Sequence, residues 1–214
     1  MIKVFFLIFN PGVAWDKIAL ARRGFAFITI VHLLPLIFLS TAAEAWGLRQ
    51  HGKWQGRFQM MKNFSHQDVL TFGILQFLLS FAVVFVSALL VYKISQTFRD
   101  RQPFLGAFTT IAYAFSPMFL VRFLDYGAMI HPAVTWLIGM ALTVWILYQG
   151  IPRVMQPDPT HAFGVYLSTT FVVLLTSALA RLMTAMYVLG YMDLQHSWLS
   201  RRITHLLGHN PFSP

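Results

Sequence analysis

The sequence predicts an all-α membrane protein, a bundle of five transmembrane helices preceded by an amphipathic helix at the membrane interface. Of the 214 residues, 57% are hydrophobic and 11% are charged, whereas soluble domains carry about 25% charged residues. The apolar residues gather in five segments of membrane-spanning length. No insert between them is long enough to hold its own core. We therefore expect an N-terminal interfacial segment at 1–23, one five-span domain at 24–192 and a polar tail at 193–214.

The segment before the first span has the pattern of an interfacial helix. Asn10-Pro11-Gly12 is a turn signal, and a proline suits the first turn of the helix that follows. Over residues 13–23 the apolar Trp15 and Ile18 share a face, with charged residues elsewhere. We expect Trp15 at head-group depth. The candidate lipid-contacting cations beside it are Lys17, Arg22 and Arg23.

The first span is predicted over residues 24–46, with His32 and Pro35 at its centre. Pro35 leaves the carbonyl of Val31 without its usual donor, so a neighbouring group must satisfy it. His32 is either a proton or ligand site at mid-membrane or, as we favour, a neutral histidine hydrogen-bonded inside the bundle. A cleaved signal peptide ending near 43–45 is the alternative for this region, but the apolar run is too long for one.

A polar loop at 47–67 and a second span at 69–92 follow. The loop mixes basic and aromatic residues, so it is either a solvated loop or another surface-lying helix. Asp68 is the predicted cap of the second span. Gln76 and Ser80 lie one turn apart on one face, and we expect them to hydrogen-bond to a neighbouring helix rather than to a substrate.

The third span is predicted at 104–124. Small residues between 106 and 117 favour close helix packing, and Pro117 is expected to kink the helix. Arg122 and Asp125 are three residues apart at its end, where they can pair on one face.

The fourth and fifth spans are predicted at 132–151 and 162–190. The fifth is longer than one crossing, so it is tilted or protrudes. Arg181 then lies towards the far interface, where it either snorkels to water or forms an ion pair. Its candidate partners are Glu44, Asp125 and Asp193.

The distribution of basic residues indicates the class of partner and weakly favours one orientation of the chain in the membrane. The net charge is +9, but Lys and Arg stand beside the apolar segments, as in proteins that contact anionic lipid head groups rather than nucleic acid. Five spans place the termini on opposite sides. Lys and Arg divide almost evenly between the two sides, and Arg22 and Arg23 favour a cytoplasmic N-terminus.

Three motifs follow one another along the chain. They are Asn10-Pro11-x-x-x-Trp15-x-x-Ile18, Phe104-x-x-Ala107-Phe108-x-x-x-Ala112-Tyr113-Ala114-x-x-Pro117 and Tyr148-x-Gly150-Ile151-Pro152-x-x-Met155. Together with the proline-containing first span, they resemble the Yip-domain family of Ypt/Rab-interacting membrane proteins over nearly the whole chain. The resemblance implies five spans, a cytoplasmic N-terminus and a lumenal or periplasmic C-terminus.

The same resemblance bears on function. Eukaryotic members are tied to Rab GTPases and vesicle traffic, and usually carry a longer polar region before the first span. The 23 residues here fit the short prokaryotic form, which implies a bacterial inner membrane and argues against Rab binding. No catalytic residues belong to the family pattern, so none is carried over.

The function classes can be ranked from these observations. We expect a non-enzymatic protein without a cofactor that binds membrane lipids, other integral membrane proteins or a second copy, and so organises or shapes the membrane. An accessory subunit of a larger membrane complex is the alternative. A small transporter is less favoured, since only His32 is clearly central in a span. A soft-metal site is also less favoured than packing for Met183, Met186, Met192 and His196.

Overall fold

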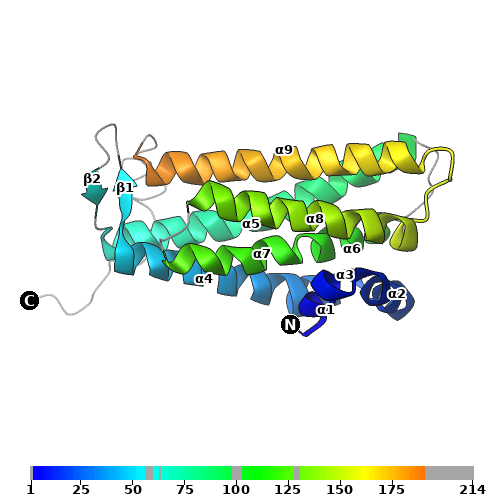
Figure 1. Cartoon of the computed structure of the whole chain (residues 1–214), viewed down its shortest axis with the longest axis horizontal. Coiled ribbons are helices and arrows are strands. Elements are labelled where there is room, and N and C mark those ends of the chain that lie inside the picture. The colour runs from blue at the N-terminus through cyan, green and yellow to red at the C-terminus, as the bar shows by residue number, and fades with distance from the viewer. Residues whose placement is uncertain (1, 56–59, 63, 98–102, 128–130, 191–214) are drawn as a thin grey trace, which may run out of the picture.

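The computed structural model is a bundle of long helices whose axes run side by side (Figure 1). It describes residues 2–55, 60–62, 64–97, 103–127 and 131–190. Within these residues, five helical segments are long and apolar enough to cross a membrane. They are 25–51, 66–97, 104–126, 132–154 and 162–188. The predicted all-α bundle of five spans is therefore confirmed, and the predicted tail at 193–214 lies outside the described residues.

The described residues form nine α-helices and two shorter helical segments of other geometry. In chain order they are α1 (Ile2–Phe9), α2 (Pro11–Ala21), α3 (Phe25–Phe27), the π-helix η1 (Ile28–Leu33), α4 (Leu34–His51), α5 (His66–Thr97), α6 (Phe104–Ala114), α7 (Ser116–Val121), the 3₁₀-helix η2 (Arg122–Gly127), α8 (Pro132–Val154) and α9 (Ala162–Val188). The first span comprises α3, η1 and α4, and the third comprises α6, α7 and η2.

Two prolines account for the interruptions in these spans. Pro35 has no N–H to donate, and the helix just before it widens to π geometry, with the Leu34 N–H donating to the Thr29 carbonyl. In the third span, the helix is broken by a turn at Phe115, and Pro117 stands in the first turn of α7. The irregularity expected at Pro117 thus lies immediately before it.

The loop after the first span differs from expectation. α4 continues to His51 and ends at Gly52, whose φ of 62° is a conformation that favours glycine. Strand β1 (Lys53–Gln55) then pairs antiparallel with β2 (Met60–Lys62). The alternative of a second surface-lying helix is therefore wrong for the described part of this loop.

The second span begins earlier than predicted because of its capping residues. The Ser65 N–H donates to Asp68 Oδ2 at 3.0 Å, and the Asp68 N–H donates to Ser65 Oγ at 3.2 Å. This reciprocal pair is a capping box in which Ser65 precedes the helix and Asp68 lies inside its first turn. Asp68 is therefore not the N-cap residue itself.

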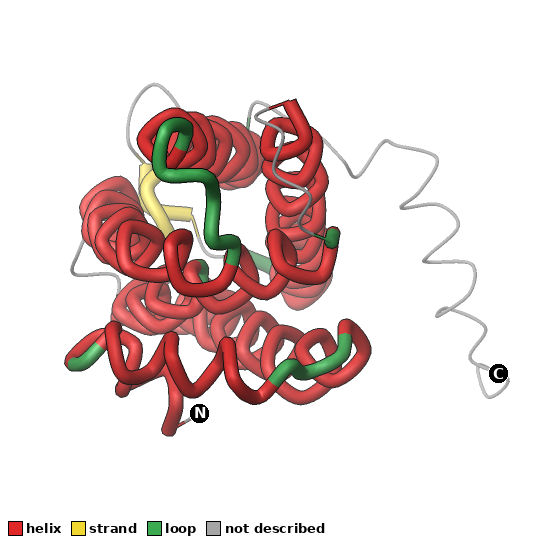
Figure 2. The backbone as a smooth tube through the Cα atoms, turned by 90° about the vertical axis from the view of Figure 1, so that its right-hand side faces the viewer, coloured by secondary structure: helices red, strands yellow, loops and turns green. Residues whose placement is uncertain are grey.

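α1 and α2 lie outside the five spans, with α2 at the end of the bundle opposite the two strands (Figures 1 and 2) and α1 nearer the middle of its length. α2 crosses the direction of the spans and packs mainly against α8. Inside the bundle, α5 packs against α4, α6 and α9, and the third span is the most buried of the five. Small side chains of α6, including Ala107, Thr110 and Ala114, are fully enclosed, as close helix packing requires.

Candidate functional site

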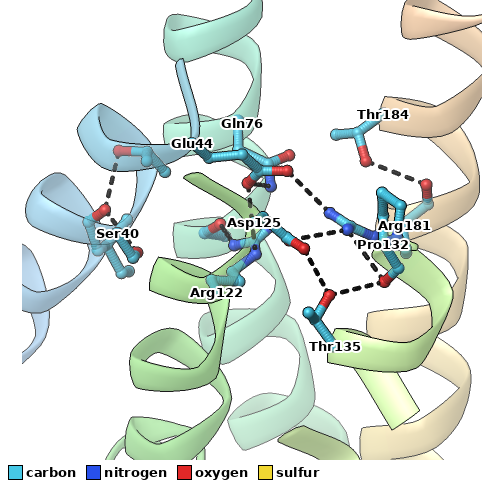
Figure 3. A network of polar contacts seen from close by, with 12 residues as sticks. Ser40, Glu44, Gln76, Arg122, Asp125, Pro132, Thr135, Arg181 and Thr184 are labelled. Atoms are coloured by element: carbon cyan, nitrogen blue, oxygen red, sulfur yellow. Dashed lines mark hydrogen bonds and ion pairs between the residues drawn. The ribbon is translucent and has the colours of Figure 1, made fainter. Parts of the chain in front are cut away.

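A cluster of charged side chains is buried inside the bundle, near the C-terminal ends of α4 and α9 (Figure 3). Glu44 comes from α4, Arg122 and Asp125 from η2, and Arg181 from α9. The Glu44 side chain is only 2% exposed and that of Arg181 is 16% exposed. Charges withdrawn this far from water are stable only when they are paired.

Arg181 is the central cation of this charge cluster. Its Nη1 donates to Glu44 Oε1 at 3.0 Å, and its Nη2 donates to Asp125 Oδ2 at 3.0 Å. The same Nη2 also donates to the carbonyl of Pro132 at 3.1 Å. One guanidinium therefore joins α9 to the first, third and fourth spans. Arginine suits this role because its planar guanidinium presents several hydrogen-bond donors in a rigid fork.

Arg122 is the second cation, and it is held by other helices than its own. Its Nε lies 3.7 Å from Glu44 Oε2, and its Nη1 donates to Ser80 Oγ of α5 at 2.8 Å. Pairing of Arg122 with Asp125 was the sequence expectation, but the short hydrogen bonds of Asp125 come from Arg181 and Thr135. Residues three apart lie on one side of a 3₁₀-helix, so η2 directs both side chains into the cluster, where each bonds to partners from other helices.

Two neutral side chains complete the charge cluster. Gln76 Nε2 donates to Glu44 Oε2 at 2.9 Å, and the Thr135 hydroxyl donates to Asp125 Oδ1 at 2.6 Å. With these, residues from all five spans take part, and two carboxylates face two guanidinium groups. The two positive and two negative formal charges cancel, and the contacts among these residues connect the five spans.

The chemistry open to the charge cluster follows from its composition. Each carboxylate accepts a hydrogen bond from Arg181, and these charge-assisted bonds direct both carboxylates inward. Within the described ranges, no group of three or more His, Cys, Asp or Glu side chains is placed to hold a metal ion. Of the methionines considered for a soft metal, Met183 and Met186 are exposed on α9, and Met192 with His196 lies outside the described residues.

A second buried site lies at the other end of the bundle, where α2 meets α8. The side chain of Trp15 is fully buried, and its Nε1 donates to the carbonyl of Ile146 at 3.1 Å. A Cβ on Gly150 would stand 2.5 Å from the indole ring, so only glycine leaves room for it. Trp15 was expected at head-group depth as a candidate lipid contact, but its ring is covered by protein, because the missing side chain of Gly150 leaves a slot in α8 that the ring fills.

The same site continues into the first and third spans. Trp15 meets Tyr113 edge-to-face, with ring centroids 6.3 Å apart. His32 stacks on the Tyr113 ring, with the two ring centroids 4.2 Å apart, and its Nε2 lies 2.9 Å from Ser116 Oγ. A histidine held by hydrogen bonding within the bundle is the arrangement we favoured for His32. We call Trp15, Gly150, Tyr113 and His32 the docking site.

The docking site brings together one residue from each of the three motifs. Trp15 belongs to the first motif, Tyr113 to the second and Gly150 to the third. A family model described as the Yip1 domain matches residues 5–181, a range that covers both buried sites. The chain belongs to the Yip1 domain family. With its five apolar helices, it is an integral membrane protein of that family.

The other comparisons add no relative. Neither a search of curated proteins nor a search of solved structures gave a significant match. The match to the Yip1 domain family thus rests on the sequence pattern between residues 5 and 181.

The remaining predicted site residues lie outside the charge cluster, and Arg23 approaches the docking site at Tyr113. Lys17 and Arg22 are exposed on α2 and at its C-terminus. Arg23 is half-buried, with its guanidinium 4.4 Å from the centroid of the Phe27 ring, so part of it is covered by an aromatic face. Pro35 is exposed and takes no part in the charge cluster.

Several residues of these sites were missed or underrated by sequence reasoning. Thr135 carried no signal beyond a polar atom in an apolar segment, and Tyr113 was noted only as a member of the second motif. Glu44 was considered only as one of three partners of Arg181, although a carboxylate inside a span is costly enough to mark a buried pair. Asp193, another of those three, lies outside the described residues.

Proposed function

We propose that this Yip1-domain protein is a non-enzymatic membrane organiser whose N-terminal helices α1 and α2 bind lipids and shape one leaflet. One observation carries the proposal: outside the five spans, the helices expose large apolar side chains beside exposed cations. Phe9 is 83% exposed and Leu20 is 82% exposed. Lys17 and Arg22 are exposed on the same short segment.

The packing of α2 against α8 determines which face of α2 remains exposed. Ala14, Trp15 and Ile18 are its buried residues, and Trp15 fixes this face against α8. The opposite side therefore turns Leu20 and Lys17 away from the bundle. Leaving a side chain such as leucine in water forgoes about 1.5–3 kcal/mol of burial. The boundary between head groups and acyl chains removes that penalty and also accepts the cations.

The same arrangement supports a role in membrane shape. α2 lies at one end of the bundle, so its volume falls in one leaflet while the spans occupy both. An interfacial helix that expands one leaflet favours curvature in which that leaflet forms the convex side. Because α2 is fixed to α8 through Trp15, the bundle holds this wedge at a constant depth and angle.

For location, we propose a bacterial inner membrane with the N-terminus in the cytoplasm and the C-terminus in the periplasm. The exposed cations of α2 support this orientation, because basic residues near the first span favour the cytoplasmic side. The chain has no cysteine, so single-cysteine variants report topology directly. Gln50→Cys should react with an impermeant maleimide from the periplasm, and Thr160→Cys only after the membrane is opened; the reverse pattern contradicts this orientation.

The proposed function is tested by curvature sorting of the full chain in vesicles of neutral and anionic phospholipid. We compare the wild type with a Phe9→Ser, Leu20→Ser variant. The matched control is Phe163→Ser, which changes a side chain 75% exposed on α9 at the same end of the bundle. Enrichment on narrow membrane tubes should fall in the double variant and persist in the control. Equal enrichment of all three proteins would contradict the proposal.

A transport route through the charge cluster is the second candidate. Its support is that Glu44, Gln76, Arg122, Asp125 and Arg181 gather at one level of the bundle, as transport sites do. We rank it second because these groups already pair with one another and leave no surplus charge to select an ion. Proton or ion flux into proteoliposomes that is lost on Arg181→Gln would reverse this ranking.

A further inference from the structure

A small cavity lies beside the charge cluster, between the second, third and fifth spans. Its volume is about 20 Å³, and its lining includes Gln76, Ser80, Met118, Arg122, Ser177 and Arg181. A cavity of about 10–15 Å³ is large enough to hold one water molecule. The space therefore suits one water and excludes a larger solute.

One residue that lines the cavity, Gln76, has a buried atom that lacks a hydrogen-bond donor in the part of the chain that the structure describes. Gln76 is fully buried, and its Nε2 is committed to Glu44 at 2.9 Å. Its Oε1 has no hydrogen-bond partner among the described residues. Exchanging the two amide atoms would turn the oxygen towards a carboxylate, so the orientation with Nε2 on Glu44 is the favourable one. A buried acceptor left unsatisfied costs about 1–3 kcal/mol.

The charges around the cavity define the class of ligand. Arg122 and Arg181 line the cavity, and both are paired with carboxylates that lie outside its lining, so the cluster as a whole has no net formal charge to hold an ion. The unsatisfied atom is an acceptor, which disfavours an anion, and the two guanidinium groups disfavour a metal cation. A small neutral molecule that donates hydrogen bonds satisfies these conditions.

We propose that this cavity is a binding site for a single ordered water molecule, which donates a hydrogen bond to Gln76 Oε1. Ser80 and Ser177 stand in the same wall and supply hydroxyl groups for its remaining bonds. The water thereby completes the hydrogen bonding of the charge cluster on the side facing the third span. This site is independent of the lipid-binding proposal for α1 and α2.

Radiolytic labelling of the full chain in nanodiscs tests the site. Hydroxyl radicals formed from a bound water oxidise the side chains next to it, so Met118 in the cavity wall should be modified although it is only 8% exposed. Met155 is fully buried and outside the cavity wall, and it is the internal reference. We expect several-fold more oxidation of Met118 than of Met155, measured by peptide mass spectrometry.

Variants then assign the labelling to Gln76. Gln76→Leu removes the acceptor and should reduce Met118 oxidation to the level of Met155. Ser87→Ala changes another buried polar side chain of α5, one that bonds Thr176, and should leave the labelling unchanged. Equal oxidation of Met118 and Met155 in the wild type would overturn the proposal, whether or not the Leu variant folds. Undiminished Met118 oxidation in a folded Gln76→Leu protein would overturn it as well.

Discussion

The indole ring of Trp15 lies directly on the backbone of Gly150, at a distance that leaves no room for a Cβ. This contact joins the helix before the first span to the end of the fourth span, and the Trp15 Nε1 bond to Ile146 fixes its direction. An exposed ion pair between Arg153 and Asp16, 3.1 Å long, adds a weak contact beside it. The orientation of α2 therefore depends mainly on one ring and one glycine.

The first prediction is that Gly150→Ala releases α2 from the bundle. The added methyl group forces the ring out of its slot, and overpacking of this kind costs about 1–3 kcal/mol. We expect a cysteine placed at Ala14, which is buried on α2, to react with a maleimide about tenfold faster in this variant. Gly73→Ala is the control, because a Cβ there meets only Ala45 at 3.6 Å. Equal reaction rates in the two variants would contradict the docking role of Gly150.

The second prediction concerns the charge cluster. Arg181→Gln leaves Glu44 and Asp125 short of a counter-charge inside the bundle, and breaking a buried pair in this way destabilises by about 3–5 kcal/mol. Thermal unfolding in one mild detergent should show a clearly lower midpoint than in the wild type. The control is Arg49→Gln, since Arg49 is exposed at the end of α4. A midpoint for Arg181→Gln that equals the control would show that the cluster does not hold the spans together.

The third prediction tests the close approach of the first and third spans. A Cβ on Gly47 would lie 2.6 Å from the Tyr126 carbonyl oxygen and 2.7 Å from its Cα, and a backbone cannot rotate away as a side chain does. Gly47→Ala should therefore separate α4 from η2 and destabilise by about 1–3 kcal/mol. Gly24→Ala, where a Cβ meets nothing within 4 Å, should unfold at nearly the wild-type temperature. Similar unfolding of both variants would argue against this tight contact.

The fourth prediction is that His32 is replaceable by an aromatic ring. His32→Phe keeps the stack on Tyr113 and loses one hydrogen bond to Ser116, whose hydroxyl still reaches the Ala112 carbonyl at 3.4 Å. The expected loss is about 1 kcal/mol in denaturant unfolding. A loss as large as that of Arg181→Gln would give His32 a larger part in stability than its contacts suggest.

The five spans were predictable from sequence because hydropathy and length depend on neighbouring residues alone. Span ends were less accurate, as at Ser65 and Asp68, where a capping bond decides the first helical residue. The burial of Trp15 was not predictable, because the slot that receives it belongs to Gly150, far along the chain. An amphipathic pattern shows that one face is apolar, but not whether lipid or protein covers it.

The charge cluster was foreseeable in its members and not in its geometry. A charge inside a span needs a partner, and this reasoning already connected Arg181 with Glu44 and Asp125. That a single guanidinium binds both carboxylates depends on how three helices, α4, η2 and α9, approach one another. No sequence pattern predicts how the helices pack. The hydrogen bond of Thr135 to Asp125 depends on this packing alone.

The central claim, that the free face of α2 contacts lipid, is tested most directly by the depth of that face. Nitroxide labels at Leu20→Cys and Lys17→Cys, in a chain with no other cysteine, report collisions with oxygen and with a water-soluble nickel chelate. We predict that the label at Leu20 collides mainly with oxygen among the acyl chains, and that the label at Lys17 collides with the chelate at the head groups. Equal and high collision with the chelate at both positions would place α2 in water and contradict the claim.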